Sequence, residues 1–299
     1  LKIKFWRQYM SEEQVPKQGQ GYLIPAMQDF EYEQATALAY SIKTNNKDAS
    51  VTLVTNYTDR VPHHFHDAFD HIIELPFGSN EITRCNDWQM YWATPYLYNI
   101  VIDPASLVKE NHNSIWEFLI DQYDICFFNQ AHSFKGDLLE NKKVQIYKQD
   151  YDMTLVYGNM YYFKHDTDLA LAYHKLADPF QQNWRDVFAK YFKEQHRPKY
   201  YNNDVMHSIL NTVILYEDMN MHNDIIKTVN MPTTLSDGCI GFWPKWTDRL
   251  NTWISNGAKV KIQNFAMHTN LYYGEQEFLT KEIFDGHRQA FTSTAKRGN

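Results

Sequence analysis

The sequence predicts an α/β fold in which a mostly parallel, mixed sheet is flanked by helices. Two observations support this prediction. Short apolar runs of strand length recur between residues 21 and 163, and stretches with helical periodicity separate several of them. A chain of 299 residues is long enough for one large domain, and neither a linker nor an internal repeat divides it. We therefore expect a single domain over residues 1–299.

The first half of the chain alternates expected strands with expected helices. A helix is expected around Ala35, Leu38 and Ile42, which recur at helical spacing, and another opens at a capping box that begins at Ser114. Strands are expected at residues 21–26, 51–54, 71–75, 99–102 and 124–128. This order favours parallel strands with helices covering the sheet.

The second half contains more helices and ends irregularly. Residues 153–163 are expected to form two extended pieces that break at Gly158 and Asn159. Helical stripes occupy residues 169–176 and 180–191, and Asp204 opens a further apolar helix. Beyond about residue 228, repeated glycine and proline predict an irregular C-terminal lobe.

Composition limits the possible partners and locations. The formal net charge of -7 excludes a uniformly basic coat for nucleic acid, although it leaves room for a local basic groove. Cys85, Cys126 and Cys239 are far apart, which favours reduced thiols over a disulfide framework. No apolar run approaches the roughly 18 residues of a membrane span. The sequence thus predicts a cytoplasmic protein without a membrane partner.

Candidate ligand-binding residues follow the expected strands. In open α/β sheets, ligands bind beyond the carboxyl ends of the strands. Asp103 comes directly after the apolar residues 100–102, and Thr55 and Asn56 end the strand at 51–54. A carboxylate in the position of Asp103 can hold a metal ion or a ribose hydroxyl, and a turn or helix cap is the structural alternative.

Five short motifs, in the same order along the chain, resemble the core of GT-A glycosyltransferases. The first motif consists of WQMYWATPY at 88–96 followed by IVIDPASLV at 100–108, which together resemble the helix and strand that deliver the Asp-x-Asp motif of that family. The other four are IPAM with AYSIK at 24–43, VYGNMYYFK at 156–164, NDVMH at 203–207, and MHT with EFLT at 267–280. The resemblance covers about residues 21–284 and is closest to phage-encoded glycosyltransferases, distant relatives of glycogenin-like enzymes.

The resemblance implies an enzyme with two functional parts. A nucleotide-binding part would cover about residues 20–130, and a part for the sugar and acceptor about residues 131–285. The implied reaction moves a hexosyl or pentosyl group from a nucleotide-diphosphate donor, expected to be a UDP-sugar. The acceptor would be a hydroxymethylated base of phage DNA, otherwise a glycan or a protein. A phage-encoded enzyme would act in the host cytoplasm.

The resemblance also implies the site residues. Asp204 and Asn203 take the catalytic positions, although Asp204 also fits a helix-capping acid. Asp103 and His268 take the positions of ligands to Mn²⁺ or Mg²⁺, although a core role also fits His268. Gly158 either lets the backbone approach the sugar or marks a β-bulge. The implied donor-binding residues are Pro25, Ala26, Met27, Thr55, Asn56, Trp88, Asp103, Ala105, Gly158 and Asn159.

Two positions depart from the family pattern. Ala105 stands where the second aspartate of the Asp-x-Asp motif belongs, so Asp103 is the remaining carboxylate of the pair. Asn86 stands where family members commonly carry lysine. One anionic metal ligand and one cation are therefore missing from the expected diphosphate site.

Three interpretations of these departures stay open. The chain binds metal weakly through Asp103 and His268, or it works without metal and balances the phosphates with Arg84, Lys245 or Lys261. In the third interpretation the chain has lost catalysis and is a nucleotide-sugar or glycan binding protein.

Overall fold

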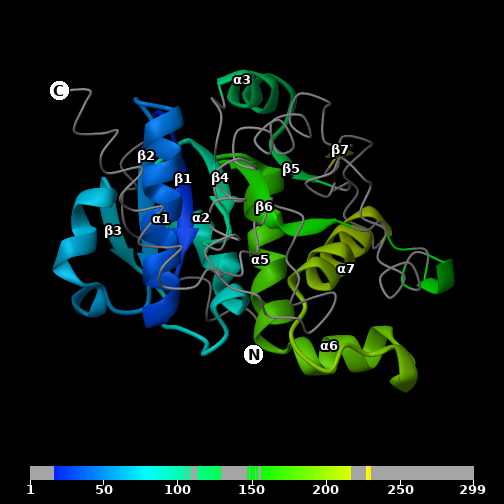
Figure 1. Cartoon of the computed structure of the whole chain (residues 1–299). Helices are drawn as coiled ribbons and strands as arrows, with labels where there is room; N and C mark the ends of the chain where they lie inside the picture. The colour runs from blue at the N-terminus through cyan, green and yellow to red at the C-terminus, as the bar shows by residue number, and fades with distance from the viewer. Residues whose placement is uncertain are drawn as a thin grey trace, which may run out of the picture.

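The strands of the chain form one sheet. The computed structural model describes residues 17–104, 106, 108, 113–128, 147, 149–151, 153, 156–216 and 227–229. Within this part, the seven-stranded sheet has the order β3-β2-β1-β4-β6-β5-β7 (Figure 1). The strands are β1 (Gln20–Pro25), β2 (Ser50–Thr55), β3 (His71–Glu74), β4 (Tyr98–Ile102), β5 (Ile125–Phe128), β6 (Tyr157–Lys164) and β7 (Lys227–Val229).

One half of the sheet is parallel. β1 pairs in parallel with β2 and β4, and β2 pairs in parallel with β3. Leu23 lies at the centre, opposite Thr52 on one side and Val101 on the other. The near-continuous apolar runs of β1, β2 and β4 are buried, as is usual for parallel strands covered on both faces, whereas the edge strand β3 is partly exposed. The predicted α/β class with a mostly parallel, mixed sheet is confirmed.

The other half is mixed, because β6 runs antiparallel to both β4 and β5. Phe127 pairs with Tyr161, but Phe128 pairs with Tyr157, so residues 158–160 bulge out against β5. On its other side β6 stays in register with β4, where Met160 lies opposite Ile102. The two extended pieces predicted around Gly158 and Asn159 are one strand, β6, but its pairing is irregular at these two residues: pairing with β4 reaches only to Met160, and the bulge against β5 contains both.

Helices cover the sheet, and the sheet divides the buried core into two layers. The apolar side chains of one face, such as Tyr22, Ile24 and Ile100, belong to one buried cluster. Those of the other face, such as Leu23 and Val101, belong to a second cluster, as the alternation of side chains along a strand requires. The helices are α1 (Asp29–Asn45), α2 (Met90–Ala93), α3 (Asn113–Gln122), α5 (Asp168–Gln182), α6 (Trp184–Tyr191) and α7 (Asn203–Tyr216). Short 3₁₀ turns include η3 (His63–Ala68) and η4 (Thr83–Gln89).

Most predicted elements are present in the described part of the chain. The helices expected around residues 35–42, from 114 and at 169–176 correspond to α1, α3 and α5. The expected stripe at 180–191 is split at Asn183, where α5 ends and α6 begins. β7 was not predicted. The expected irregular lobe lies outside the described residues, since only 227–229 are described beyond residue 216.

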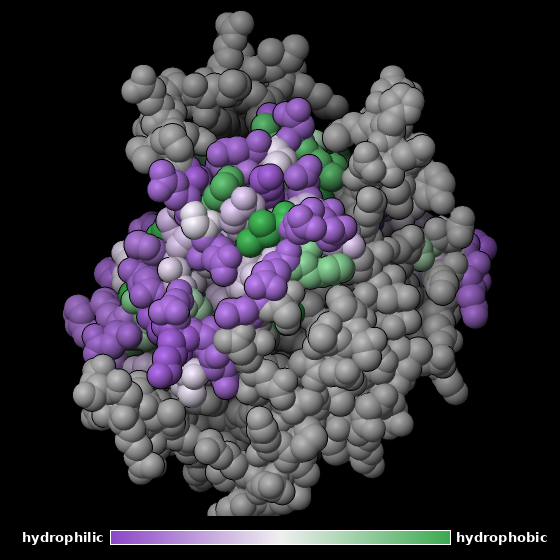
Figure 2. All heavy atoms as spheres, turned by 90° about the horizontal axis from the view of Figure 1, so that it is seen from above, coloured by the Kyte–Doolittle hydropathy of each residue, from purple (hydrophilic) through white to green (hydrophobic). Residues whose placement is uncertain are grey.

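Thiols and surface polarity agree with the expectations from composition. Cys85 and Cys126 are buried free cysteines, whereas Cys239 lies outside the described residues. No helix in the described ranges is long and apolar enough to cross a membrane. Seen from above, the described surface is mainly hydrophilic, with scattered hydrophobic side chains (Figure 2).

A histidine lies inside the second core layer. His174 of α5 is 1% exposed, and its Nδ1 lies 2.7 Å from the carbonyl oxygen of Ala170. Its ring packs edge-on against Phe163, with centroids 4.8 Å apart. Burial lowers the pKa of His174 to about 3, so the folded protein keeps this imidazole neutral.

This burial predicts acid lability. An unfolded histidine takes up a proton near pH 6.5, whereas folded His174 stays neutral to about pH 3. Stability linked to this residue is therefore present at pH 7 and is lost as the pH falls, by about 2 kcal/mol at pH 5. We expect His174→Phe to remove that part of the pH dependence in urea unfolding at pH 7 and pH 5. The exposed His63→Gln is the control, and an unchanged pH dependence in His174→Phe would contradict the assignment.

Candidate functional site

Several predicted donor-binding residues meet at the carboxyl edge of the parallel strands. Pro25, Thr55 and Ile102 end β1, β2 and β4, and Asp103 follows β4 directly. The backbone N–H of Ala26 donates to the carbonyl of Val54 across a distance of 2.9 Å, which joins the first loop to β2. The structure thus brings the ends of β1, β2 and β4 to one edge, as the sequence predicted.

The residues that follow β1 and β2 at this edge are mostly buried. Met27 is 5% exposed, Thr55 is fully buried and Asn56 is half-buried. The Thr55 hydroxyl lies 2.8 Å from the hydroxyl of Tyr32, which donates a longer bond of 3.5 Å to Asn56 Oδ1. Tyr32 itself is 1% exposed, so its ring packs in the core and its hydroxyl orients Thr55 and Asn56.

Glu31 is an acid of this edge that the sequence analysis did not single out. Its carboxylate accepts from the backbone N–H of Met27 and of Gln28, over 2.8 and 3.1 Å. It also accepts from the hydroxyl of Thr83, at 2.6 and 2.9 Å to its two oxygens. Burial raises the pKa of Glu31, these hydrogen bonds oppose the rise, and the nearby charge of Asp103 adds to it. The carboxylate therefore ties the β1–α1 loop to η4 beside Asp103.

Asp103 is buried next to a cation. Its exposed fraction is 4%, and its backbone carbonyl accepts from the N–H of Ser106 at 3.0 Å. Burial alone would lower the pKa of Arg84, but the charges of Asp87 and then Asp103 raise it overall. Asp103 therefore lies within the electrostatic range of both Glu31 and Arg84.

Arg84 and Asp87, both in η4, form a buried ion pair. Arg84 Nη2 lies 2.9 Å from Asp87 Oδ2 and donates to the carbonyl oxygen of Gly158 at 2.5 Å. The two side chains are 10% and 1% exposed. Arg84 Nε and Nη1 have no hydrogen-bond partner among the described residues. Two buried nitrogen atoms of a charged guanidinium are thus available to an anion.

The predicted catalytic pair holds the backbone of Gly158. Asn203 Nδ2 donates to the Gly158 carbonyl at 2.8 Å, and Asp204 Oδ1 accepts from the Gly158 N–H at 2.8 Å. Because Nδ2 also faces Asp87 Oδ2 at 3.4 Å, two acceptors fix the orientation of the Asn203 amide. Asn203 Oδ1 accepts from the hydroxyl of Tyr201 at 3.3 Å.

These contacts give Gly158 a packing role. A Cβ at this position would lie 2.3 Å from Cδ2 of His207 and 2.8 Å from Nδ2 of Asn203. The missing side chain therefore makes room for α7, and residues 158–160 form the bulge against β5 that the sequence offered as the alternative. Of Asn159, only the backbone position within β6 is described.

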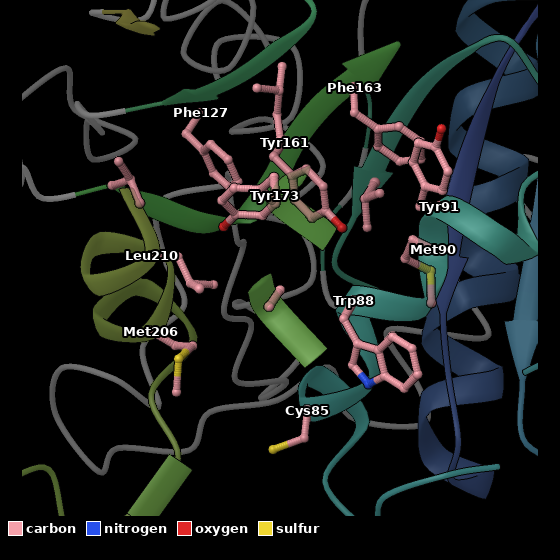
Figure 3. Close-up of a cluster of buried hydrophobic side chains, with 14 of the residues drawn as sticks. Cys85, Trp88, Met90, Tyr91, Phe127, Tyr161, Phe163, Tyr173, Met206 and Leu210 are labelled. Carbon is pink, nitrogen blue, oxygen red and sulfur yellow. The ribbon is translucent and has the colours of Figure 1, made fainter. Parts of the chain in front are cut away.

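A histidine that the sequence did not single out extends this network. His207 is 1% exposed; its Nε2 lies 3.5 Å from Asp87 Oδ2, and its Nδ1 contacts the hydroxyl of Tyr173. Burial lowers the pKa of His207, while the hydrogen bond and charge of Asp87 oppose the fall. Tyr161 donates to the Asp87 carbonyl at 3.3 Å. Figure 3 shows Tyr161 and Tyr173 side by side in this core, next to Phe127.

The side chains of two η4 residues, Trp88 and Asn86, are held by contacts within the protein. Trp88 stacks on Phe77 with ring centroids 5.4 Å apart, and its backbone N–H donates to Gln181 of α5. Asn86 is fully buried and bonds the backbone of Asn80 through both its amide nitrogen and its oxygen. The residue at the expected lysine position therefore shapes the 80–86 loop, while Arg84 supplies the nearby cation.

The predicted metal site is described only at Asp103. Ala105 and His268 lie outside the described residues, as do Lys245 and Lys261. Within the described ranges, no group of three or more His, Cys, Asp or Glu residues is arranged to hold a metal ion. Glu31 is a described carboxylate within the electrostatic range of Asp103, and three hydrogen-bond donors already engage it.

Comparison with known proteins gives distant structural likenesses. No protein-family model matches the chain, and no curated protein sequence matches it. The apo glycosyltransferase GlyE of Streptococcus pneumoniae TIGR4 matches at 7% identity and a TM-score of 0.48, covering 94% of this chain and 63% of GlyE. The galactosyltransferase LgtC, solved with donor and acceptor sugar analogs, matches at 12% identity and a TM-score of 0.49, covering 93% of this chain and 95% of LgtC.

A third likeness is to mouse xyloside xylosyltransferase 1, at 9% identity and a TM-score of 0.44, covering 71% of this chain and 85% of that structure. The chain thus spans less than two thirds of the length of GlyE. All three TM-scores lie below 0.5, so the functional assignment depends on the residues of this chain.

The buried ion pair predicts a large stability effect. Asp87→Asn leaves the Arg84 cation buried opposite a neutral amide, and we expect a loss of about 3–5 kcal/mol in urea unfolding. The exposed pair between Lys43 and Asp70, 3.1 Å apart, provides the control. Lys43→Met should cost no more than about 1 kcal/mol. Similar losses in both variants would show that the ion pair has no special role.

Proposed function

We propose that the chain transfers a sugar from a nucleotide-diphosphate donor, specifically a UDP-sugar, at the carboxyl edge of its parallel strands. The observation that supports this most is Asp103, buried directly after β4 and within the field of Arg84. The motifs that resemble GT-A glycosyltransferases contain both the strand that delivers Asp103 and the Asn203–Asp204 pair. Open α/β sheets bind nucleotides at this edge.

In this proposal, the ends of β1 and β2 bind the nucleoside. Residues 25–27 would contact it with their backbone, and Thr55 and Asn56 with side-chain oxygen and nitrogen atoms. The support is the hydrogen bonding of Tyr32, which orients both Thr55 and Asn56. A site whose polar side chains are fixed before binding loses less conformational entropy when the ligand arrives.

Arg84 would balance the diphosphate. Its Nε and Nη1 have no partner among the described residues, and both are buried, so hydrogen bonds to phosphate oxygens would be strong. The charge of Arg84 is maintained by Asp87 and Asp103, which raise its pKa against the effect of burial. This corresponds to the metal-independent interpretation of the sequence.

The described residues do not form a complete site for Mn²⁺ or Mg²⁺. Asp103 is one carboxylate, Ala105 has no ligating atom in its side chain, and Glu31 is engaged by three donors. A bound divalent cation would neutralise charge on the leaving nucleotide. We assign no step of the reaction to it.

The transfer breaks the bond between the anomeric carbon and the diphosphate oxygen, and the nucleoside diphosphate leaves with the electron pair of that bond. The acceptor oxygen forms the new bond to the anomeric carbon, and its proton passes to the leaving diphosphate or to water. Asn203 would contact the sugar, since its amide orientation is fixed by Gly158 and Asp87. Asp204 would act as a positioning residue, because its carboxylate already accepts from the Gly158 N–H. From the resemblance, the acceptor is a hydroxymethylated base of DNA, with a glycan or protein hydroxyl as the alternative.

Binding of a nucleotide-sugar or glycan without turnover is the second candidate. This candidate is favoured because the two carboxylates around Gly158, those of Asp87 and Asp204, already form contacts within the protein. Asp87 pairs with Arg84, and Asp204 holds the Gly158 backbone. Neither carboxylate is then positioned to take the acceptor proton, whereas both could support a binding site.

Thermal-shift titration with UDP, GDP and their sugars, with and without Mn²⁺, tests the proposal. A hundredfold excess over Kd should stabilise the fold by about 2.7 kcal/mol. We expect a shift without metal and roughly tenfold weaker binding in Arg84→Lys, because an ammonium lacks the planar fork of a guanidinium. Arg185→Lys, an exposed site, is the control. No shift with any nucleotide would refute the proposal, and a shift only with Mn²⁺ would refute the metal-independent role of Arg84.

Ala105→Asp tests the missing metal ligand. A second carboxylate two residues after Asp103 restores the Asp-x-Asp pattern, and we expect metal-dependent donor hydrolysis to rise at least about tenfold. Ala105→Asn, with a neutral side chain of similar size, should give no such rise. Equal behaviour of both variants while the donor still binds would favour the binding protein.

A further inference from the structure

A basic segment of the chain leads into the candidate site. Between residues 185 and 199, five of the 15 residues are lysine or arginine, against 29 of 299 in the whole chain. Two acids, Asp186 and Glu194, lie in the same segment, so its formal charge is +3 (five minus two) in a chain of net charge -7. The five cations are Arg185, Lys190, Lys193, Arg197 and Lys199.

These cations are exposed. α6 buries Trp184 and Phe188, one turn apart, so Arg185 and Lys190 lie on its outer side. Lys193 and Lys199 are also exposed, and none of these four cations forms an ion pair with a described residue. Their charges are therefore not neutralised by acids of the described part.

Arg197 holds the segment against the helix. Its Nε donates to the carbonyl of Phe192 at 3.0 Å, and its Nη2 to that of Ala189 at 3.1 Å. These carbonyls lie at the C-terminal end of α6, where a cation is stabilised by the helix dipole. The chain after α6 thus turns back on the helix end at Arg197, which lies between Lys193 and Lys199 in the sequence.

Two adjacent tyrosines join this segment to the site. Tyr201 donates to the carbonyl of Arg84 at 3.2 Å and to Asn203 Oδ1, and its ring lies 6.0 Å from Trp184 of α6. Tyr200, the residue before it, is 81% exposed. An exposed aromatic ring among cations therefore lies next to the residues that fix Asn203.

We propose that Arg185, Lys190, Lys193, Lys199 and Tyr200 form a face, called here the α6 face, that binds a single-stranded nucleic acid. The role of the α6 face as the acceptor-binding surface rests on the proposed function, because this face would lead a single strand of nucleic acid to Asn203. The four cations would neutralise phosphates, and Tyr200 would stack on a base.

Tyr200 favours a nucleic acid over an anionic glycan. Cations alone fit any polyanion, and their attraction carries no information about the partner. A flat ring that is 81% exposed gains most from the π-face of a base, which every nucleotide offers. A sulfated glycan would depend on the cations and gain little from Tyr200.

Fluorescence anisotropy with a labelled 20-mer of thymidine tests the α6 face on the full-length chain. With four phosphates neutralised, the slope of log K against log salt should be about −2.8, so binding should weaken about 50-fold between 50 and 200 mM salt. Tyr200→Ala should weaken binding about five- to 150-fold, whereas Tyr200→Phe should retain most of it.

A pair of charge-matched variants separates the α6 face from overall charge. Lys190→Glu with Lys193→Glu changes the net charge by -4 and should abolish measurable binding at 200 mM salt. Lys47→Glu with Lys164→Glu makes the same change at the opposite, amino edge of the parallel strands and should leave a much smaller effect. Equal losses in both variants would overturn the proposal.

A heparin fragment, which has charge but no bases, is the competing probe. Tighter binding of heparin than of the oligonucleotide, with no effect of Tyr200→Ala on either, would overturn the proposal in favour of an anionic glycan. Absence of oligonucleotide binding at 50 mM salt would also overturn it. Oligonucleotide binding without any nucleotide-induced thermal shift would support the α6 face and refute the transferase, so the two failures are distinguishable.

Discussion

The buried ion pair between Arg84 and Asp87 is the constraint on which the candidate site depends. A guanidinium that is 10% exposed needs a counter-charge, and Asp87 provides it from one turn further along η4. Asp87 also faces His207 and Asn203 of α7, and Arg84 reaches Gly158 of β6. Three elements far apart in sequence are therefore held together by one charge pair, and the orientation of the Asn203 amide follows from it.

The change of direction in the sheet brings the two halves of the site together. β4 is parallel to β1 but antiparallel to β6, with Ile102 opposite Met160. Asp103, one residue beyond Ile102, is thereby placed at the level of the bulge that contains Gly158. The carboxyl edge of the parallel strands and the start of α7 meet there. A glycine is needed in this bulge because a Cβ would strike His207 and Asn203.

The sequence predicted the elements better than it predicted the contacts. Apolar runs and helical spacing located β1, β2, β4 and α1, because both patterns are local and follow from burial. Instead of a break at Gly158, the strand continues through a bulge, which the low strand preference of glycine alone does not distinguish from a break. Arg84 and Asp87 contact Gly158 and Asn203, which are 74 and 116 residues away, and no local pattern encodes such distances. Asn86 was read as a lost cation, whereas its buried bonds to Asn80 give it a structural role.

The distribution of charge favours an anionic ligand in spite of the net charge of -7. Glu31, Asp87 and Asp103 are acids of this edge; hydrogen-bond donors engage Glu31, and Arg84 engages Asp87. A ligand without acceptor atoms would leave the buried Nε and Nη1 of Arg84 without hydrogen-bond partners, which is costly. A diphosphate supplies those acceptors. Because the acids keep Arg84 charged, they favour this ligand indirectly, while the cations of α6 remain outside on the surface that a polyanionic acceptor would approach.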